Sequence, residues 1–262
     1  MSRSTAPGGR VRCRATELLL DAPALALVAA LGIIAAVVGG IGGFGTGIIL
    51  TAALAPLIGV KAVIPVLAVA GAIINAGRFW FYRQNVDRRT LVLVLACALP
   101  FLLLGAWIYS VLDARAVGTV LGVVVMLAVP LRRYLNRRRI ALGRTGLAVG
   151  SGVFGLASGL TSGVGVILIS LLLGTGMSGP AVLATDALVS IVLDVCKAAL
   201  FQRLALLDEQ TFVTGVVIGV ATIPGSAIAA WLVKRMHAHL HVFFMEGLIL
   251  AGGASLLWNS WR

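Results

Sequence analysis

Four long stretches of this chain contain no charged residue, and they restrict it to one class of fold. Residues 22–60, 90–112, 145–185 and 210–233 carry no Asp, Glu, Lys or Arg. Hydrophobic residues make up 60% of the 262 positions and charged residues only 11%, whereas a soluble domain has about 25% charged residues. A helix needs about 20 mainly apolar residues to cross a bilayer. The sequence therefore predicts an all-α integral membrane protein.

The hydrophobic pattern predicts eight net transmembrane helices. They are expected at residues 24–46, 62–82, 91–111, 115–131, 146–168, 180–202, 211–233 and 242–259. With the N-terminus inside, 15 Lys and Arg residues fall in cytoplasmic segments and only 4 in outer loops, as the positive-inside rule expects. The 15 cations lie at 1–14, 83–89, 132–144, 203 and 262, and the other 4 are Lys61, Arg115, Lys234 and Arg235. We predict a multi-pass protein in a lipid bilayer with both termini cytoplasmic. Because the cations lie in short segments between apolar spans, the net charge of +12 is explained by topology, and we predict no nucleic-acid partner.

Two of the charge-free runs are too long for one straight crossing. Residues 22–60 and 145–185 hold 39 and 41 positions. At 1.5 Å per residue, a continuous helix of that length would reach about 60 Å, roughly twice the hydrocarbon thickness of a bilayer. Glycine-rich segments at 39–47 and 155–165 mark where each helix breaks. We expect each run to cross once, with its break formed either by a kink or by a re-entrant turn.

The two glycine-rich breaks are also candidate binding sites. Interrupted helices in transporters direct the free N–H groups and positive dipole ends of half-helices toward anionic ligands. The alternative is that the small residues only let neighbouring helices approach closely. The residues expected to contact a ligand are Gly45, Thr46 and Gly47 in the first break and Thr161, Ser162, Gly163 and Gly165 in the second.

Two apolar segments carry a polar residue three positions before a cation. Asn75 precedes Arg78 in the first, and Asp194 precedes Lys197 in the second, at a constant offset of 119. A charge in a hydrophobic span costs several kcal/mol unless it has a partner or a function. Repeating this arrangement at equivalent places indicates one polar site built from two related halves.

A nearly equal offset between the glycine-rich segments defines the expected domain organisation. Gly45 and Gly47 match Gly163 and Gly165 at an offset of 118. We predict an N-terminal cytoplasmic tail (1–21), a first four-helix repeat (22–131), a basic cytoplasmic linker (132–144) and a second four-helix repeat (145–262). With four net crossings in each half, the repeats are expected to share one orientation, related by an axis along the membrane normal.

The charged residues within the spans suggest separate roles. Arg78 has no acidic neighbour on its own helical face, and a free guanidinium suits bidentate binding of sulfonate, sulfite or carboxylate. Lys197 is the second candidate ligand, with Asp194 tuning its charge, while Asp186 is a candidate for proton coupling. The alternatives are that Arg78 and Lys197 extend to the lipid headgroups, and that Asp186 makes a structural hydrogen bond.

No motif indicates an enzyme, a metal site or a cofactor. The cysteines Cys13, Cys97 and Cys196 are far apart, and no CxxC pair occurs. His237, His239 and His241 alternate in a predicted loop, and on a helix alternate positions scatter around the axis. No set of nucleophile and base and no phosphate-binding loop is present.

At these residues the chain resembles the TauE/SafE family of membrane transporters, a family of sulfite and organosulfonate exporters or anion permeases. The resemblance covers residues 25–258 and rests on the glycine-rich segments 39–47 and 158–165, the polar second helix of each half and the basic linker. It implies two four-helix repeats in a bacterial inner membrane. One departure is that Thr46 and Val164 interrupt the glycine blocks.

The combined expectation is a secondary transporter that exports a small sulfur-containing anion through a cavity between the two halves. The substrate class comes from the resemblance, since the spacing of residues alone argues only for a polar site that favours anions. A permease for another small anion or organic acid, and a non-transporting membrane scaffold, remain as alternatives. Whether the chain forms a homo-oligomer is left open.

Overall fold

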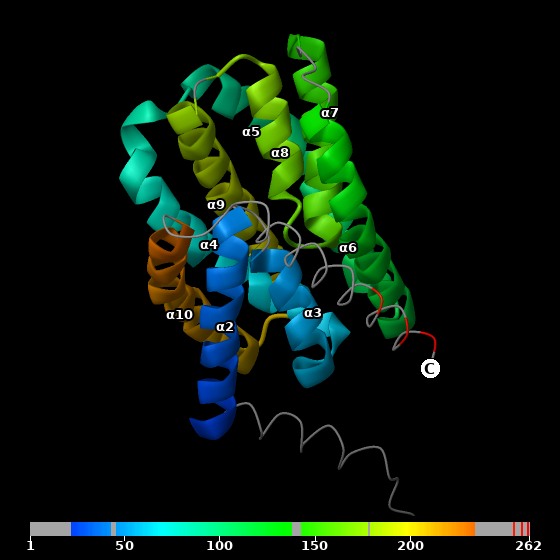
Figure 1. Cartoon of the computed structure of the whole chain (residues 1–262). Coiled ribbons are helices and arrows are strands. Elements are labelled where there is room, and N and C mark those ends of the chain that lie inside the picture. Colours follow the sequence, from blue (N-terminus) through cyan, green and yellow to red (C-terminus); the bar gives the residue numbers. More distant parts are fainter. Residues whose placement is uncertain are drawn as a thin grey trace, which may run out of the picture.

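The computed structural model describes residues 22–42, 46–137, 143–177 and 179–233, together with residues 254, 258 and 261. Throughout these residues all regular structure is helical, which confirms the predicted all-α class. The helices are α2 (Ala22–Gly42), α3 (Thr46–Ile58), α4 (Val60–Tyr82), α5 (Arg88–Val111), α6 (Ala114–Arg137), α7 (Arg144–Leu160), α8 (Gly165–Gly174), α9 (Gly179–Arg203) and α10 (Glu209–Val233), with a 3-10 turn η1 (Arg83–Asn85). Helices α4 and α9 pack against each other (Figure 1).

Several of these helices are suited to a bilayer. Four described segments are long and apolar enough to cross a membrane, namely Val60–Trp80, Arg88–Val111, Gly179–Arg203 and Glu209–Ile228. Large apolar side chains such as Val92, Val149 and Phe212 are exposed, whereas the charged groups of Asp186 and Lys197 are buried. This is the distribution expected of a helix bundle whose outer surface faces lipid. The predicted last span, 242–259, lies almost wholly outside the described residues.

Both long apolar runs are broken within their glycine-rich segments, as predicted. In the first run α2 ends at Gly42 and α3 begins at Thr46. In the second run α7 ends at Leu160, where Thr161 is extended (φ −149°, ψ −176°), and α8 begins at Gly165. Gly163 adopts a φ of +85°, a left-handed conformation that glycine takes without steric cost. Residues 43–45, including Gly45, lie outside the described part of the chain.

The second break reverses the direction of the chain. A Cβ placed on Gly150 of α7 would lie 2.5 Å from Leu171 Cδ2 of α8. If α8 continued the axis of α7, these two residues would be about 30 Å apart, at 1.5 Å per residue. Helix α8 therefore folds back along α7, and together they form what we call the second hairpin.

The first break produces the same reversal. Gly32 of α2 lies against Ile218, and Gly225 of α10 lies against Ile33, so α2 and α10 run parallel. Gly215 lies against Val66 and Gly219 against Ile73, so α10 in turn runs parallel to α4. Helix α3 joins α4 through the single residue Gly59, which has a φ of +82°, and runs antiparallel to it. Helices α2 and α3 therefore form a first hairpin.

These reversals correct two predictions. Each long run was expected to cross once, but each returns to the end of the bundle from which it started. Because a hairpin adds no net crossing, the first half changes sides through α4, α5 and α6 alone, and the second half begins inverted. The prediction that the halves share one orientation is therefore wrong.

The contacts of the central helices support the inverted relation. Helices α4 and α9 are antiparallel, because Gly71 lies against Asp194 while Arg78 reaches Asp186. The packing of the outer helices is matched between the halves, with α2 against α10 and α7 against α5 (Figure 1). Helix α5 begins beside the first turns of α9, where the Asp87 N–H donates to Thr185 Oγ1 at 3.2 Å.

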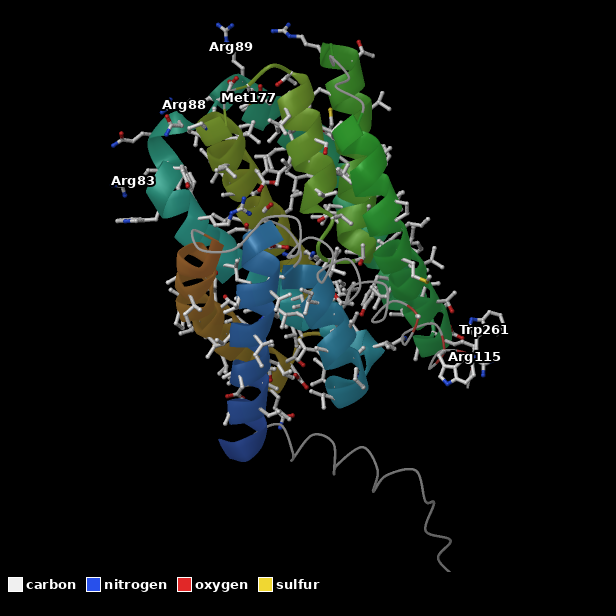
Figure 2. All side chains as sticks on the ribbon, in the orientation of Figure 1. Arg83, Arg88, Arg89, Arg115, Met177 and Trp261 are labelled. Atoms are coloured by element: carbon white, nitrogen blue, oxygen red, sulfur yellow. The ribbon has the colours of Figure 1, made fainter. Side chains whose placement is uncertain are left out.

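The reversal also bears on the predicted placement of the termini. Figure 2 shows Arg83, Arg88 and Arg89 at one end of the bundle and Arg115 and Trp261 toward the other. Helix α2 is parallel to α4, so it begins at the Arg115 end, whereas α7 begins at the opposite end. The N-terminal tail (1–21) and residues 138–142 of the basic linker lie outside the described residues. The helices that follow them start at opposite ends, so the prediction that both segments are cytoplasmic does not fit this order of helices.

Small residues make the contact between α5 and α7 very close. A Cβ on Gly155 would meet the carbonyl oxygen of Ala98, and one on Gly159 would meet the carbonyl oxygen of Leu102. A Cβ on Gly105 would lie 2.5 Å from the carbonyl oxygen of Leu156. For these glycines the packing explanation of a small-residue motif is the correct one.

Candidate functional site

The tips of the two hairpins meet inside the bundle. A Cβ on Gly47 would lie 3.0 Å from both Gly163 N and Ser162 Oγ, and a Cβ on Gly163 would lie 2.5 Å from Ile48 Cγ1. Only glycine allows the backbones to approach this closely. Because α3 begins at Thr46 and α8 begins at Gly165, the N-terminal ends of both helices lie at this contact.

A cavity of about 580 Å³ opens next to the hairpin tips. Its lining comes from both hairpins and from α4 and α9, with one residue of α10. The polar and glycine positions of the lining are Thr46, Gly47, Gly71, Asn75, Arg78, Tyr82, Ser158, Ser162, Gly163, Gly165, Asp186, Ser190, Asp194, Lys197 and Ser226. Apolar side chains such as Leu50, Phe154 and Ile169 complete it. The cavity has the size of a small-molecule site, which typically holds about 300–1,000 Å³.

Arg78 lies at the wall of this cavity with two partners. Its Nη1 donates to Asn75 Oδ1 at 3.1 Å, and its Nη2 forms an ion pair with Asp186 Oδ2 at 2.9 Å. The Arg78 side chain is 32% exposed, whereas that of Asp186 is 2% exposed. Asp186 is therefore almost fully enclosed, whereas about a third of the Arg78 side chain remains accessible, and both residues line the cavity. Sequence reasoning found Asn75 but missed this acidic partner, which lies 108 positions away on another helix.

Lys197 lies deeper and uses its charge internally. Its side chain is 2% exposed, and its Nζ forms an ion pair with Asp194 Oδ1 at 3.2 Å. The same nitrogen donates to the Ser158 carbonyl oxygen at 3.1 Å. Ser158 is in the last turn of α7, whose end carries the negative end of the helix dipole. Lys197 therefore stabilises the broken end of α7 as well as bordering the cavity.

Gly71 provides the space that Asp194 occupies. A Cβ on Gly71 would collide with Asp194 Oδ2, so only glycine fits between α4 and the carboxylate. Gly71 shares a helical face with Asn75 and Arg78, and that spacing is the signal that could have identified it as a site residue. Ser190, one turn before Asp194, lines the cavity in the same way and was likewise not predicted as a ligand.

The remaining predicted residues are divided between the cavity and its surroundings. Thr46, Gly47, Ser162, Gly163 and Gly165 all belong to the cavity lining. Thr161 is fully buried and outside that lining, and its hydroxyl lies 3.4 Å from the Ser162 carbonyl oxygen as a donor. Gly45 is outside the described residues.

The formal charges of the lining cancel. Arg78 and Lys197 contribute two positive charges, and Asp186 and Asp194 contribute two negative charges. The unsatisfied N–H groups at the starts of α3 and α8 add partial positive charge at the hairpin tips. The arrangement is therefore a polar cavity with one partly open guanidinium and two helix N-termini, which suits a small anion.

The described part of the chain shows no metal site at this cavity. No group of three or more His, Cys, Asp and Glu side chains able to hold a metal ion occurs among the described residues. The histidines His237, His239 and His241 lie outside the described range.

Comparison with known proteins confirms the predicted resemblance. The family model for the sulfite exporter TauE/SafE matches residues 28–256, which is most of the chain. Neither curated proteins nor solved structures gave a match. The match covers both hairpins, the helices that line the cavity and the basic linker. The chain therefore belongs to the TauE/SafE family of sulfite exporters, a family of membrane transporters.

Proposed function

We propose that this protein is a secondary transporter that exports a small sulfur-containing anion, sulfite or an organosulfonate, through the cavity at the hairpin tips. The observation that carries the proposal is the partly exposed side chain of Arg78 in a cavity of about 580 Å³. The chain belongs to a sulfite exporter family, which indicates the kind of anion. A cavity of this volume has room for an organosulfonate or for a sulfite ion with some of its water.

The anion would be held by groups from both halves. The open side of Arg78 presents a fork of N–H donors that matches two oxygens of a sulfite or sulfonate group. Thr46, Gly47, Ser162, Gly163 and Gly165 would supply hydroxyl and backbone N–H donors at the two helix starts. Asn75 holds the guanidinium in place at 3.1 Å.

Three further predicted residues would support the groups that hold the anion. Lys197 supplies positive charge while bonded to Asp194 and to the end of α7, and Asp194 sets how much of that charge an anion feels. Thr161 supports the second tip from outside the lining. Gly45, adjacent to Thr46, is proposed as part of the first tip.

We further propose that the chain consists of two inverted repeats, residues 22–131 and 145–262, joined by the basic linker at 132–144. The matched hairpins and the antiparallel pair α4 and α9 support this arrangement. Inverted repeats let one set of helices rock against the other around a fixed site, which gives alternating access. The eight predicted crossings then become two re-entrant hairpins and the crossings of α4, α5, α6, α9, α10 and the predicted last span.

The orientation in a bacterial inner membrane follows from the arginines. Arg83, Arg88 and Arg89 lie at the end of the bundle where the basic linker leaves α6 (Figure 2). The positive-inside rule assigns this end to the cytoplasm. Both termini are then expected on the opposite side, in contrast to the initial prediction.

Flux through proteoliposomes tests the substrate and the class of protein together. Vesicles loaded with sulfite, sulfoacetate, taurine or acetate should release sulfite or a sulfonate faster than vesicles without protein. Release of acetate alone would instead assign a permease for organic acids. Absence of flux for every anion would favour a non-transporting scaffold. The Arg78→Ala, Lys197→Ala double variant should lose the flux, and full activity of that variant would refute the site.

A further inference from the structure

We propose that Asp186 binds one proton whenever Arg78 binds the anion, so that proton and anion occupy the site and cross the membrane together. This inference rests on the proposed transport function and adds the coupling ion, its binding group and the sign of the coupling.

The first observation is that Asp186 and the anion need the same guanidinium. Asp186 Oδ2 lies 2.9 Å from Arg78 Nη2, and the anion would approach the same side chain from the cavity. The cavity lining has no net formal charge while Asp186 is ionised. An ionised Asp186 therefore repels an arriving anion and weakens the positive field of Arg78. Neutralising Asp186 removes both effects.

The second observation is how little else holds the charge of Asp186. Its side chain is 2% exposed, and Oδ1 is buried without a hydrogen-bond partner among the described residues. An ionised carboxylate offers about four acceptor positions, and Arg78 is the side chain that donates to this one. Once Arg78 turns toward an anion, Asp186 becomes a desolvated charge without a donor, which is costly. Uptake of a proton by the carboxylate removes that cost.

The neighbouring charges leave this role to Asp186. On its own helix, Lys197 is already bonded to Asp194 and to the Ser158 carbonyl oxygen, so it cannot replace Arg78. Helix α8 carries no titratable residue.

The groups at the adjacent end of the bundle are occupied or exposed. The Asp87 carboxylate caps α5 through the N–H groups of Arg89 and Thr90, and Arg83, Arg88 and Arg89 are exposed. Asp194, the other acid of the cavity, keeps its own lysine when the anion binds. Asp186 is thus the acid whose charge depends on the state of Arg78.

The proton balance of a transport cycle follows directly. On loading, the Asp186 carboxylate takes one proton from the water of the open side and becomes a neutral acid, and Arg78 transfers to the anion. On release, the anion leaves, the proton returns to water on the other side, and the ion pair forms again. Because binding linkage is reciprocal, the proton and the anion strengthen each other, which is the thermodynamic condition for transport in the same direction. Export then proceeds down an outward anion gradient that exceeds the inward pH gradient. With a monovalent anion the loaded site carries no added charge.

Equilibrium binding of methanesulfonate to purified protein between pH 5.5 and 8.5 tests this coupling. Methanesulfonate stays a monoanion over this range, so only the protein titrates. We expect binding to weaken by about tenfold per pH unit at the alkaline end, as linkage to one proton requires, and weakly buffered samples should take up about one proton per bound anion. Asp186→Asn should bind with little dependence on pH, and Glu209→Gln, which removes an exposed acid outside the cavity, should retain the pH slope of the wild type.

The outcomes separate the coupling from the site itself. Binding without proton uptake, or with proton release, would overturn the coupling while leaving the anion site intact. Absence of methanesulfonate and sulfite binding at every pH would overturn both proposals. Proton uptake by the wild-type protein decides the matter even if Asp186→Asn fails to fold.

Discussion

The ion pair between Arg78 and Asp186 should be a strongly coupled element of stability, and removing both partners should cost less than the sum of the two single removals. We consider four proteins: the wild type, Arg78→Gln, Asp186→Asn and the double variant. The pair joins α4 to α9, so it also ties the two halves of the chain together. Replacing Arg78 alone leaves a carboxylate that is 2% exposed without its partner.

The expected magnitudes follow from the geometry. At an N–O distance of 2.9 Å and an effective dielectric constant of about 20, the gross attraction is roughly 6 kcal/mol. Desolvation cancels much of this attraction, and breaking a fully buried pair typically costs about 3–5 kcal/mol. Since the Arg78 side chain is 32% exposed, solvent lowers that value, and we expect Arg78→Gln to cost about 2–3 kcal/mol. Asp186→Asn should cost about 1 kcal/mol, because Arg78 can still be hydrated from the cavity.

The double variant replaces both charges by neutral amides and should be less destabilised than the sum of the single changes, by about 2 kcal/mol. Reversible unfolding of the purified proteins in mixed micelles of mild detergent and SDS, followed by circular dichroism, gives the four free energies of unfolding. Additive effects of the two substitutions would show that the pair is not coupled. The reasoning that Arg78 and Asp186 act as one unit in the site would then be wrong.

Three further predictions concern the hairpins, the topology and the driving force. Gly163→Ala should destabilise the protein by about 2 kcal/mol or more in the same unfolding assay, because its φ of +85° disfavours a Cβ and Ile48 occupies the space. Gly165 faces open space, so Gly165→Ala should be nearly neutral. Equal losses of stability in the two variants would contradict the contact between the hairpin tips. In a chain without native cysteines, Thr145→Cys should require a membrane-permeant reagent for labelling in intact cells, whereas Ala114→Cys should react with an impermeant reagent. The same reactivity at both positions would refute the placement of the two ends of the bundle on opposite sides of the membrane. Finally, methanesulfonate flux in proteoliposomes should change little under a potassium diffusion potential but respond to a pH gradient, and the reverse dependence would argue against proton coupling.

The sequence was sufficient to predict the breaks and the polar faces, and the reasons are local. A charge-free run of 39 residues exceeds the bilayer whatever its surroundings, and the glycines within it are the positions that a helix tolerates least. Asn75 and Arg78 share a face because of the helical repeat alone. Such features depend on neighbouring residues along the chain, so they can be inferred without knowledge of the tertiary fold.

The direction of the chain after each break could not be inferred in this way. A broken run of 39 residues is long enough either to cross once at an angle or to return, and its composition is the same in both cases. The contact between Gly150 and Leu171 distinguishes them, but it depends on how two helices pack, which periodicity does not encode. Counting one crossing for each run therefore put the N-terminal tail on the wrong side and reversed the expected orientation of α9 and α10, while that of α4, α5 and α6 was unchanged.

The pairing of buried charges on different helices could not be predicted either, because it also depends on how helices pack. Spacing along one helix placed Asp194 beside Lys197 correctly, because both lie on α9. Asp186 is on the same helix but pairs with Arg78 of α4, and only the antiparallel packing of α4 and α9 brings them together. The sequence therefore predicted most of the polar residues that line the cavity, but not the ion pair that joins α4 to α9.

The most direct test of the account is sulfite efflux from proteoliposomes containing the Arg78→Gln, Asp186→Asn double variant. This variant lacks the proposed anion ligand without leaving a buried charge unpaired, so a loss of flux cannot be ascribed to an orphaned carboxylate. We predict efflux reduced by about 100-fold, equivalent to about 2.7 kcal/mol. Arg83→Gln, which removes an exposed guanidinium stacked 4.2 Å from the Trp80 ring centre, should stay within about twofold of the wild type. Efflux by the double variant at the wild-type rate would contradict the central claim that Arg78 binds the transported anion.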